Sequence, residues 1–125
     1  MNIQKRRAIA YITGRIISKI ESATVYDYTT LTSHSMSGEI SDNSINVYDH
    51  DRLNTLTGTS TDGTNYSIVD YATNNHIKLE INNLHFSGYD QETSTNFKGS
   101  VVGKLVAFHD FEDSNDHNYS LSFEN

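Results

Sequence analysis

The sequence predicts an all-β domain: an antiparallel up-and-down meander of about 11 strands that closes into a barrel or folds over into a sandwich. A unit of about 21 residues recurs along the 125-residue chain, and apolar and polar residues alternate within it with a period of two. Turn sequences rich in Asn, Asp and Gly join one unit to the next. A parallel β-solenoid is the alternative, because it shows the same repeat.

An aspartate marks the same position in every unit. The five are spaced by 22, 21, 20 and 20 residues: Asp27, Asp49, Asp70, Asp90 and Asp110. In "NYSIVDY" (65–71), Tyr66, Ile68 and Asp70 share one face, and the residues between them share the other. A second alternating segment, "HIKLEI" (76–81), follows it. Each unit therefore consists of two strands, and the first strand ends at the aspartate.

The junctions between strands favour antiparallel pairs over a solenoid. Between units, "NNLH" (82–85) suits a two-residue hairpin turn, which places Ile81 opposite Phe86 on the same face. Within the third unit, we expect a four-residue loop at 72–75 that places Asp70 opposite Ile77. Equivalent turns elsewhere pair Ile40 with Ile45 and Val101 with Val106.

We expect one domain over residues 1–125, made of three parts. Residues 1–7 form a basic arm, residues 8–20 form a half repeat whose "YITGRI" (11–16) matches the second strand of a unit, and residues 21–125 form five full repeats. The apolar columns face inward, and inward glycines leave room for the large side chains opposite them. The interior is therefore expected to be a filled core rather than a ligand cup.

Charge is unevenly distributed along the chain. The first twenty residues carry five Lys and Arg and no acid, whereas the other 105 carry four Lys and Arg against sixteen Asp and Glu. An acidic body repels nucleic acid and anionic lipid, and no segment is apolar enough to span a membrane. We therefore expect no nucleic-acid or membrane partner. The chain has no secretory signal pattern, which favours a cytoplasmic protein, although export by a route without such a signal stays open.

The recurring aspartates are interpreted as structural turn residues whose carboxylates accept backbone N–H groups of the adjoining loop. The alternative is a rim of carboxylates that binds a metal ion or a cationic ligand. The densest group of potential ligands lies in "HDFEDSNDH" (109–117), with Asp110, Asp113, Asp116 and His117 as weak metal candidates. The chain has no recognised metal-binding motif, and we expect no metal and no cofactor.

Aromatic side chains gather on the outward side of the first strand of each unit. The candidate binding residues are Tyr26, Tyr28, Tyr48, His50, Tyr71, Tyr89, His109 and Phe111. Exposed aromatics flanked by hydrogen-bonding side chains suit a protein partner, a second copy of the chain, or a sugar. They are also good strand formers with no binding role required.

The expected function is therefore a non-catalytic interaction module that binds a protein partner or itself through this outer aromatic face. The alternative is a carbohydrate or small-ligand binding protein. Six His residues show none of the spacings typical of catalytic metal sites, and no Ser stands in a nucleophile motif. We therefore expect that this protein is not an enzyme.

Overall fold

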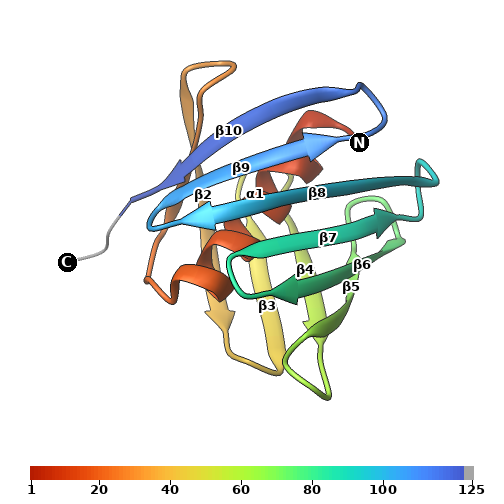
Figure 1. Ribbon diagram of the computed structural model, residues 1–125. Helices are drawn as coiled ribbons and strands as arrows, with labels where there is room; N and C mark the ends of the chain where they lie inside the picture. The colour runs from red at the N-terminus through yellow and green to blue at the C-terminus, as the bar shows by residue number, and fades with distance from the viewer. Residues whose placement is uncertain (123–125) are drawn as a thin grey trace.

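The computed structural model describes residues 1–122, which form one helix and ten strands (Figure 1). These elements are α1 (Ile3–Ser18), β1 (Thr24–Asp27), β2 (Thr32–Ile40), β3 (Ser44–Asp49), β4 (Asn54–Thr59), β5 (Asn65–Asp70), β6 (Asn75–Asn82), β7 (His85–Asp90), β8 (Thr95–Val102), β9 (Leu105–Asp110) and β10 (Asn115–Leu121).

The ten strands form a closed antiparallel barrel. Each strand pairs with its neighbour in the chain, and β1 also pairs with β10, where Val25 lies opposite Leu121. Each repeat is one hairpin, so the meander and the barrel form of closure are confirmed. The solenoid alternative is wrong, because every pair is antiparallel. A closed sheet leaves no strand edge for another chain to extend.

The register between units agrees with the sequence, whereas the register within the third unit differs. Ile81 lies opposite Phe86 as expected, but Asp70 lies opposite Asn75 instead of Ile77. The loop therefore begins directly after the aspartate. Asn74 closes it with a φ of 56°, a conformation that Asn tolerates well. A shift of two residues leaves every side chain on its expected face.

Residues 3–18 form a helix, so the basic arm at 1–7 and the strand expected within 8–20 are both wrong. Asn2 caps the helix by accepting a hydrogen bond of 2.7 Å from the Lys5 N–H. The helix ends at Ser18 and is capped by Lys19, whose φ is 59° and whose N–H donates to the Arg15 carbonyl. Residues 1–122 therefore contain ten strands instead of about eleven, and the segment expected to be a half repeat fills the barrel as a helix.

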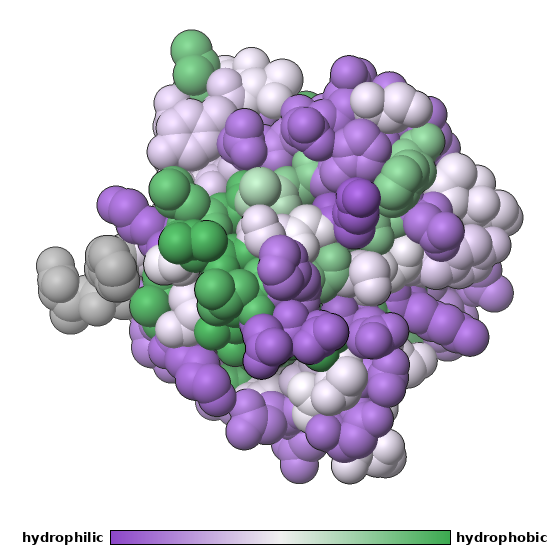
Figure 2. Space-filling model, viewed as in Figure 1, coloured by the Kyte–Doolittle hydropathy of each residue, from purple (hydrophilic) through white to green (hydrophobic). Residues whose placement is uncertain are grey.

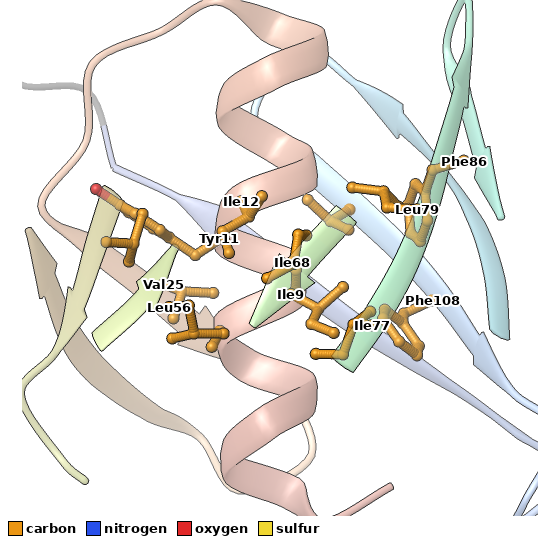
Figure 3. Packing of buried hydrophobic residues seen from close by; sticks show 14 of the residues in the cluster. Ile9, Tyr11, Ile12, Val25, Leu56, Ile68, Ile77, Leu79, Phe86 and Phe108 are labelled. Atoms are coloured by element: carbon orange, nitrogen blue, oxygen red, sulfur yellow. The ribbon is translucent and has the colours of Figure 1, made fainter. Parts of the chain in front are cut away.

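The helix runs through the lumen and is enclosed by the strands (Figures 1 and 3). Residues 5–15 are buried around the whole circumference of the helix. Ile9 and Ile12 point toward side chains of the strands, among them Ile68 and Ile77 (Figure 3). Gly14 fits where a Cβ atom would come within 2.8 Å of Leu121. The lumen is therefore a packed core, supplied jointly by the helix and the barrel wall.

No helix among residues 1–122 has both the length and the apolar character needed to cross a membrane.

Candidate functional site

The five recurring aspartates lie at one end of the barrel, each as the last residue of an odd-numbered strand. Their side chains point inward and are buried. Each carboxylate accepts a hydrogen bond from the backbone N–H two residues later, which is the geometry of an Asx turn. The donors are Thr29, Asp51, Ala72, Glu92 and Glu112, at 2.9 to 3.4 Å.

Basic side chains from the first turns of α1 form ion pairs with this ring of aspartates (Asp27, Asp49, Asp70, Asp90 and Asp110). Arg7 Nε lies 2.9 Å from Asp27, and Arg6 Nη1 lies 3.2 Å from Asp110. Lys5 is fully buried, with its Nζ 3.0 Å from Asp90, 3.9 Å from Asp70 and 2.8 Å from Glu92. The basic residues of the expected arm at 1–7 are therefore counter-ions inside the barrel.

One cation comes from a loop instead of the helix. Arg52 contacts Asp49 at 2.7 Å and Asp70 at 2.9 Å. Its partial burial disfavours the charge, but the hydrogen bonds and charges of the two carboxylates outweigh this effect and raise the pKa of Arg52. All five aspartates thus have a cationic partner from within the chain.

The residues singled out as weak metal candidates separate onto two sides of the barrel wall. Asp110 is buried beside Arg6 and the Met1 ammonium, and His117 Nε2 lies 2.8 Å from Asp113. Asp116 is exposed and lies 2.7 Å from His109. Burial opposes ionisation of Asp113, but hydrogen bonds from the Asn115 N–H and from His117 outweigh it and lower its pKa. Among residues 1–122, no three His, Asp or Glu side chains cluster as metal ligands.

The candidate aromatic residues form a ring around the barrel rather than a single face. They lie on or directly after β1, β3, β5, β7 and β9, which occupy alternate positions around the closed sheet. Tyr48 and Tyr89 are 36% and 38% exposed, yet they stand on nearly opposite sides. Neighbours on one strand touch edge to face, as Tyr26 and Tyr28 do at 4.8 Å. A single compact partner therefore reaches only part of the ring.

One part of the outer wall is hollowed into a groove of about 750 Å³. It crosses the sheet from β5 to the end of β9, with Tyr89 and Phe111 among its aromatic side chains. The short outward side chains of Ser67 and Ser87 lie among longer ones and leave the space. The groove is also lined by Lys78 and Glu80 of β6 and by Asn96 and Lys98 of β8.

Strand register sets the order of side chains along the groove. In one row across the sheet, Lys78 lies opposite Tyr89 and Tyr89 lies opposite Asn96. In the next row, Glu80 lies opposite Ser87 and Ser87 lies opposite Lys98. The ammonium of Lys98 lies 5.6 Å from the centre of the Phe111 ring, within the range of a cation–π contact. Lys78, Glu80 and Lys98 thus bring charges of both signs to one groove.

A second exposed apolar surface lies at the end of the barrel opposite the aspartates. Figure 2 shows hydrophobic side chains gathered over the β6–β7 and β8–β9 turns. The exposed residues of these turns are Leu84, Val102 and Leu105, and Val102 pairs with Leu105. The Leu84 carbonyl accepts a hydrogen bond from the Val101 N–H, so the two turns lie side by side.

The sequence indicated the exposed aromatics but neither the groove nor its lysines. The available signal was the coincidence of short outward residues, Ser67 and Ser87, with Lys78 and Lys98 on the strands beside them. Comparison with protein-family models, with curated proteins and with solved structures finds no match to this chain, so function is inferred from its own residues alone.

Proposed function

We propose that this chain is a non-catalytic binding module whose groove between Tyr89 and Phe111 receives a segment of a protein partner. The observation that carries the proposal is the coincidence of a groove of about 750 Å³ with two of the exposed aromatics of the ring. Aromatic residues are enriched where proteins bind one another, because they offer large contact areas at low entropic cost.

The groove suits an extended segment better than a flat partner surface. From Ser67 on β5 to Phe111 after β9 it crosses four strand spacings, which is about 19 Å. An extended chain of about six residues covers that length. Asn96 places a hydrogen-bonding group between Tyr89 and Phe111, and Ser87 places another in the adjacent row, where the backbone of such a segment would lie.

The rest of the molecule favours binding over catalysis. The buried aspartates are paired with cations, and the residues of the groove include no Ser, His and Asp arrangement typical of a hydrolase. A chain with a net charge of −7 is also a poor partner for nucleic acid or anionic lipid. A protein partner or a second copy of the chain is consistent with both features.

A carbohydrate is the second candidate for the same groove. The aromatic rings of Tyr89 and Phe111, with Ser87 and Asn96 beside them, combine stacking surfaces with hydrogen-bonding groups. A sugar ring needs both.

The test is selection from a library of random heptapeptides displayed on phage, with the full chain as bait. The wild-type chain should enrich a related set of peptides. Replacing Tyr89 and Phe111 with Ser should abolish the enrichment, because it removes the aromatic sides of the groove. Tyr48→Ser is the matched control, since Tyr48 is equally exposed but lies far around the barrel.

The wild type and all variants should keep the same circular dichroism. Peptides that bind the Tyr89 and Phe111 variant as well as the wild type would contradict the proposal, and so would a selection that enriches nothing. Binding of neutral glycans to the groove, lost in the same variant, would favour the carbohydrate alternative.

A further inference from the structure

Resting on the proposed function, we infer that the segment held in the groove carries two acidic side chains, received by Lys78 and Lys98, with a basic residue between them facing Glu80. The inference concerns the chemistry of the partner, which the exposed aromatics alone do not specify. It follows from the charges of the groove and from where the chain places its other cations.

Cations on this chain are scarce, and most of them are already paired. Nine Lys and Arg stand against sixteen Asp and Glu. Ion pairs within residues 1–122 involve at least six of these cations: Lys5, Arg6, Arg7, Arg15, Lys19 and Arg52. Within residues 1–122, Lys78 and Lys98 have no carboxylate within 4.0 Å, although acids are in excess. Both of them line the groove.

The two lysines are also placed to act together. Lys98 extends over the Phe111 ring, which gives its flexible side chain a preferred position. Lys78 lies beside Tyr89 on the neighbouring strand. Both belong to paired strands, so the backbone that carries them is fixed by ladders of hydrogen bonds on either side.

Register gives the spacing that a bound segment needs. Lys78 and Lys98 are two strands apart, about 10 Å, and lie in adjacent rows, about 7 Å along the strands. Their Cα atoms are therefore about 12 Å apart. An extended chain rises about 3.3 Å per residue, so its acidic side chains should be three or four residues apart.

Glu80 favours a peptide over an acidic polysaccharide as the ligand of the groove. It follows Lys78 by two residues on the same face of β6, and in its own row only Ser87 separates it from Lys98. A polymer of uronic acids repeats one charge and would place a carboxylate against Glu80. A peptide can instead alternate acid, base and acid, which matches all three side chains.

The experiment measures fluorescence anisotropy with labelled heptapeptides that contain only Ser and Tyr at the remaining positions. The first peptide has glutamate at positions two and six and arginine at position four. The second has glutamine in place of both glutamates, and the third has glutamate at position four as well. A trimer of galacturonic acid is assayed alongside by competition.

The first peptide should bind at least about tenfold more tightly than the second, and its affinity should fall as NaCl rises from 50 to 300 mM. Lys78→Gln with Lys98→Gln should remove that preference. Lys19→Gln, a matched loss of charge at the far end of the barrel, should leave it unchanged. Glu80→Gln should specifically improve binding of the third peptide.

Equal affinity for the first and second peptides, lost on replacing Tyr89 and Phe111 with Ser, would overturn the inference and leave the proposed function standing. No binding by any peptide overturns the inference as well, and the phage selection then decides the function separately. Tight binding of the galacturonate trimer, lost in the lysine variants, would replace the peptide with an acidic sugar.

Discussion

Lys5 and Lys98 lie on opposite sides of the same barrel wall. Lys5 Nζ is completely buried among Asp70, Asp90 and Glu92, whereas Lys98 is exposed and contacts the ring of Phe111. Inside, the cation is surrounded by carboxylates and has no contact with solvent. Outside, the cation has no carboxylate partner in the part of the chain that the structure describes, and it faces a groove.

The charge of Lys5 stabilises the fold, whereas the charge of Lys98 is available for binding. A buried ammonium is tolerated only when carboxylates replace its water, so Lys5 orients the helix within the barrel. An exposed ammonium keeps its water, so Lys98 can exchange that water for the carboxylate of a ligand. The same residue type therefore has opposite consequences when it is removed.

The largest effect is expected for Lys5→Met, which leaves the carboxylates of Asp70 and Asp90 buried without their ammonium. We expect the free energy of unfolding to fall by about 3–5 kcal/mol, measured by urea denaturation. Lys19→Met is the control, because the Lys19–Asp42 pair is exposed and should contribute less than about 1 kcal/mol. Equal effects of the two substitutions would show that the interior cluster does not hold the helix.

An intermediate effect is expected from Tyr119, which is buried and accepts a hydrogen bond of 2.9 Å from Arg6 Nε. Burial raises its pKa to about 12, although Arg6 opposes the shift. Because the ordinary value is about 10, the unfolded chain loses this proton first and stability declines between pH 10 and pH 12. The decline should amount to about 2–3 kcal/mol.

Thermal unfolding of the wild type and of Tyr119→Phe checks this pH dependence. Across that range the variant should show a shallower decline than the wild type, and from pH 7 to pH 9 the two curves should run parallel. Identical slopes at high pH would mean that the interior at Arg6 admits water.

The smallest effect on the free energy of unfolding is expected for the lysines on the outer surface of the barrel. Lys78→Met and Lys98→Met should each change the free energy of unfolding by less than about 0.5 kcal/mol, because neither side chain forms an ion pair with residues 1–122. The same urea measurement applies, and Lys5→Met provides the contrast. A fall of several kcal/mol in the free energy of unfolding would show that these lysines stabilise the fold as Lys5 does. It would also remove the argument that their charges are available to a ligand.

The strands could be predicted from the sequence because each repeat contains its own evidence. Asp27 and its four counterparts, the alternation in β5 and the turn at Asn83 are local signals that agree with one another in every unit. The loop after Asp70 was misplaced by one residue at each end, because several of its residues can adopt the positive φ that closes it.

The helix could not be predicted in the same way, because its evidence is not local. Tyr11, Thr13 and Arg15 alternate with Ile12, Gly14 and Ile16, which also fits a strand. What decides between the two is the lumen of a ten-stranded barrel, which must be filled. Lys5, Arg6 and Arg7 are needed as counter-ions to the buried aspartates, and that role follows only from the closed barrel, which brings the aspartates together.

The sequence predicted which aromatic residues of the candidate site face outward, but it did not predict their positions around the barrel. The outward direction of Tyr48 and Tyr89 follows from strand alternation alone. Their separation around the barrel, and the hollow beside Tyr89, depend on closure of the sheet and on which small side chains meet across strands.

The pairing of β1 with β10 sets the order in which this protein can be completed. Val25 finds its partner in Leu121 only after β10 has been synthesised, and the helix precedes β1. The helix is thus synthesised before the strands that enclose it, and its isoleucines remain accessible to chaperones or to aggregation until that seam forms.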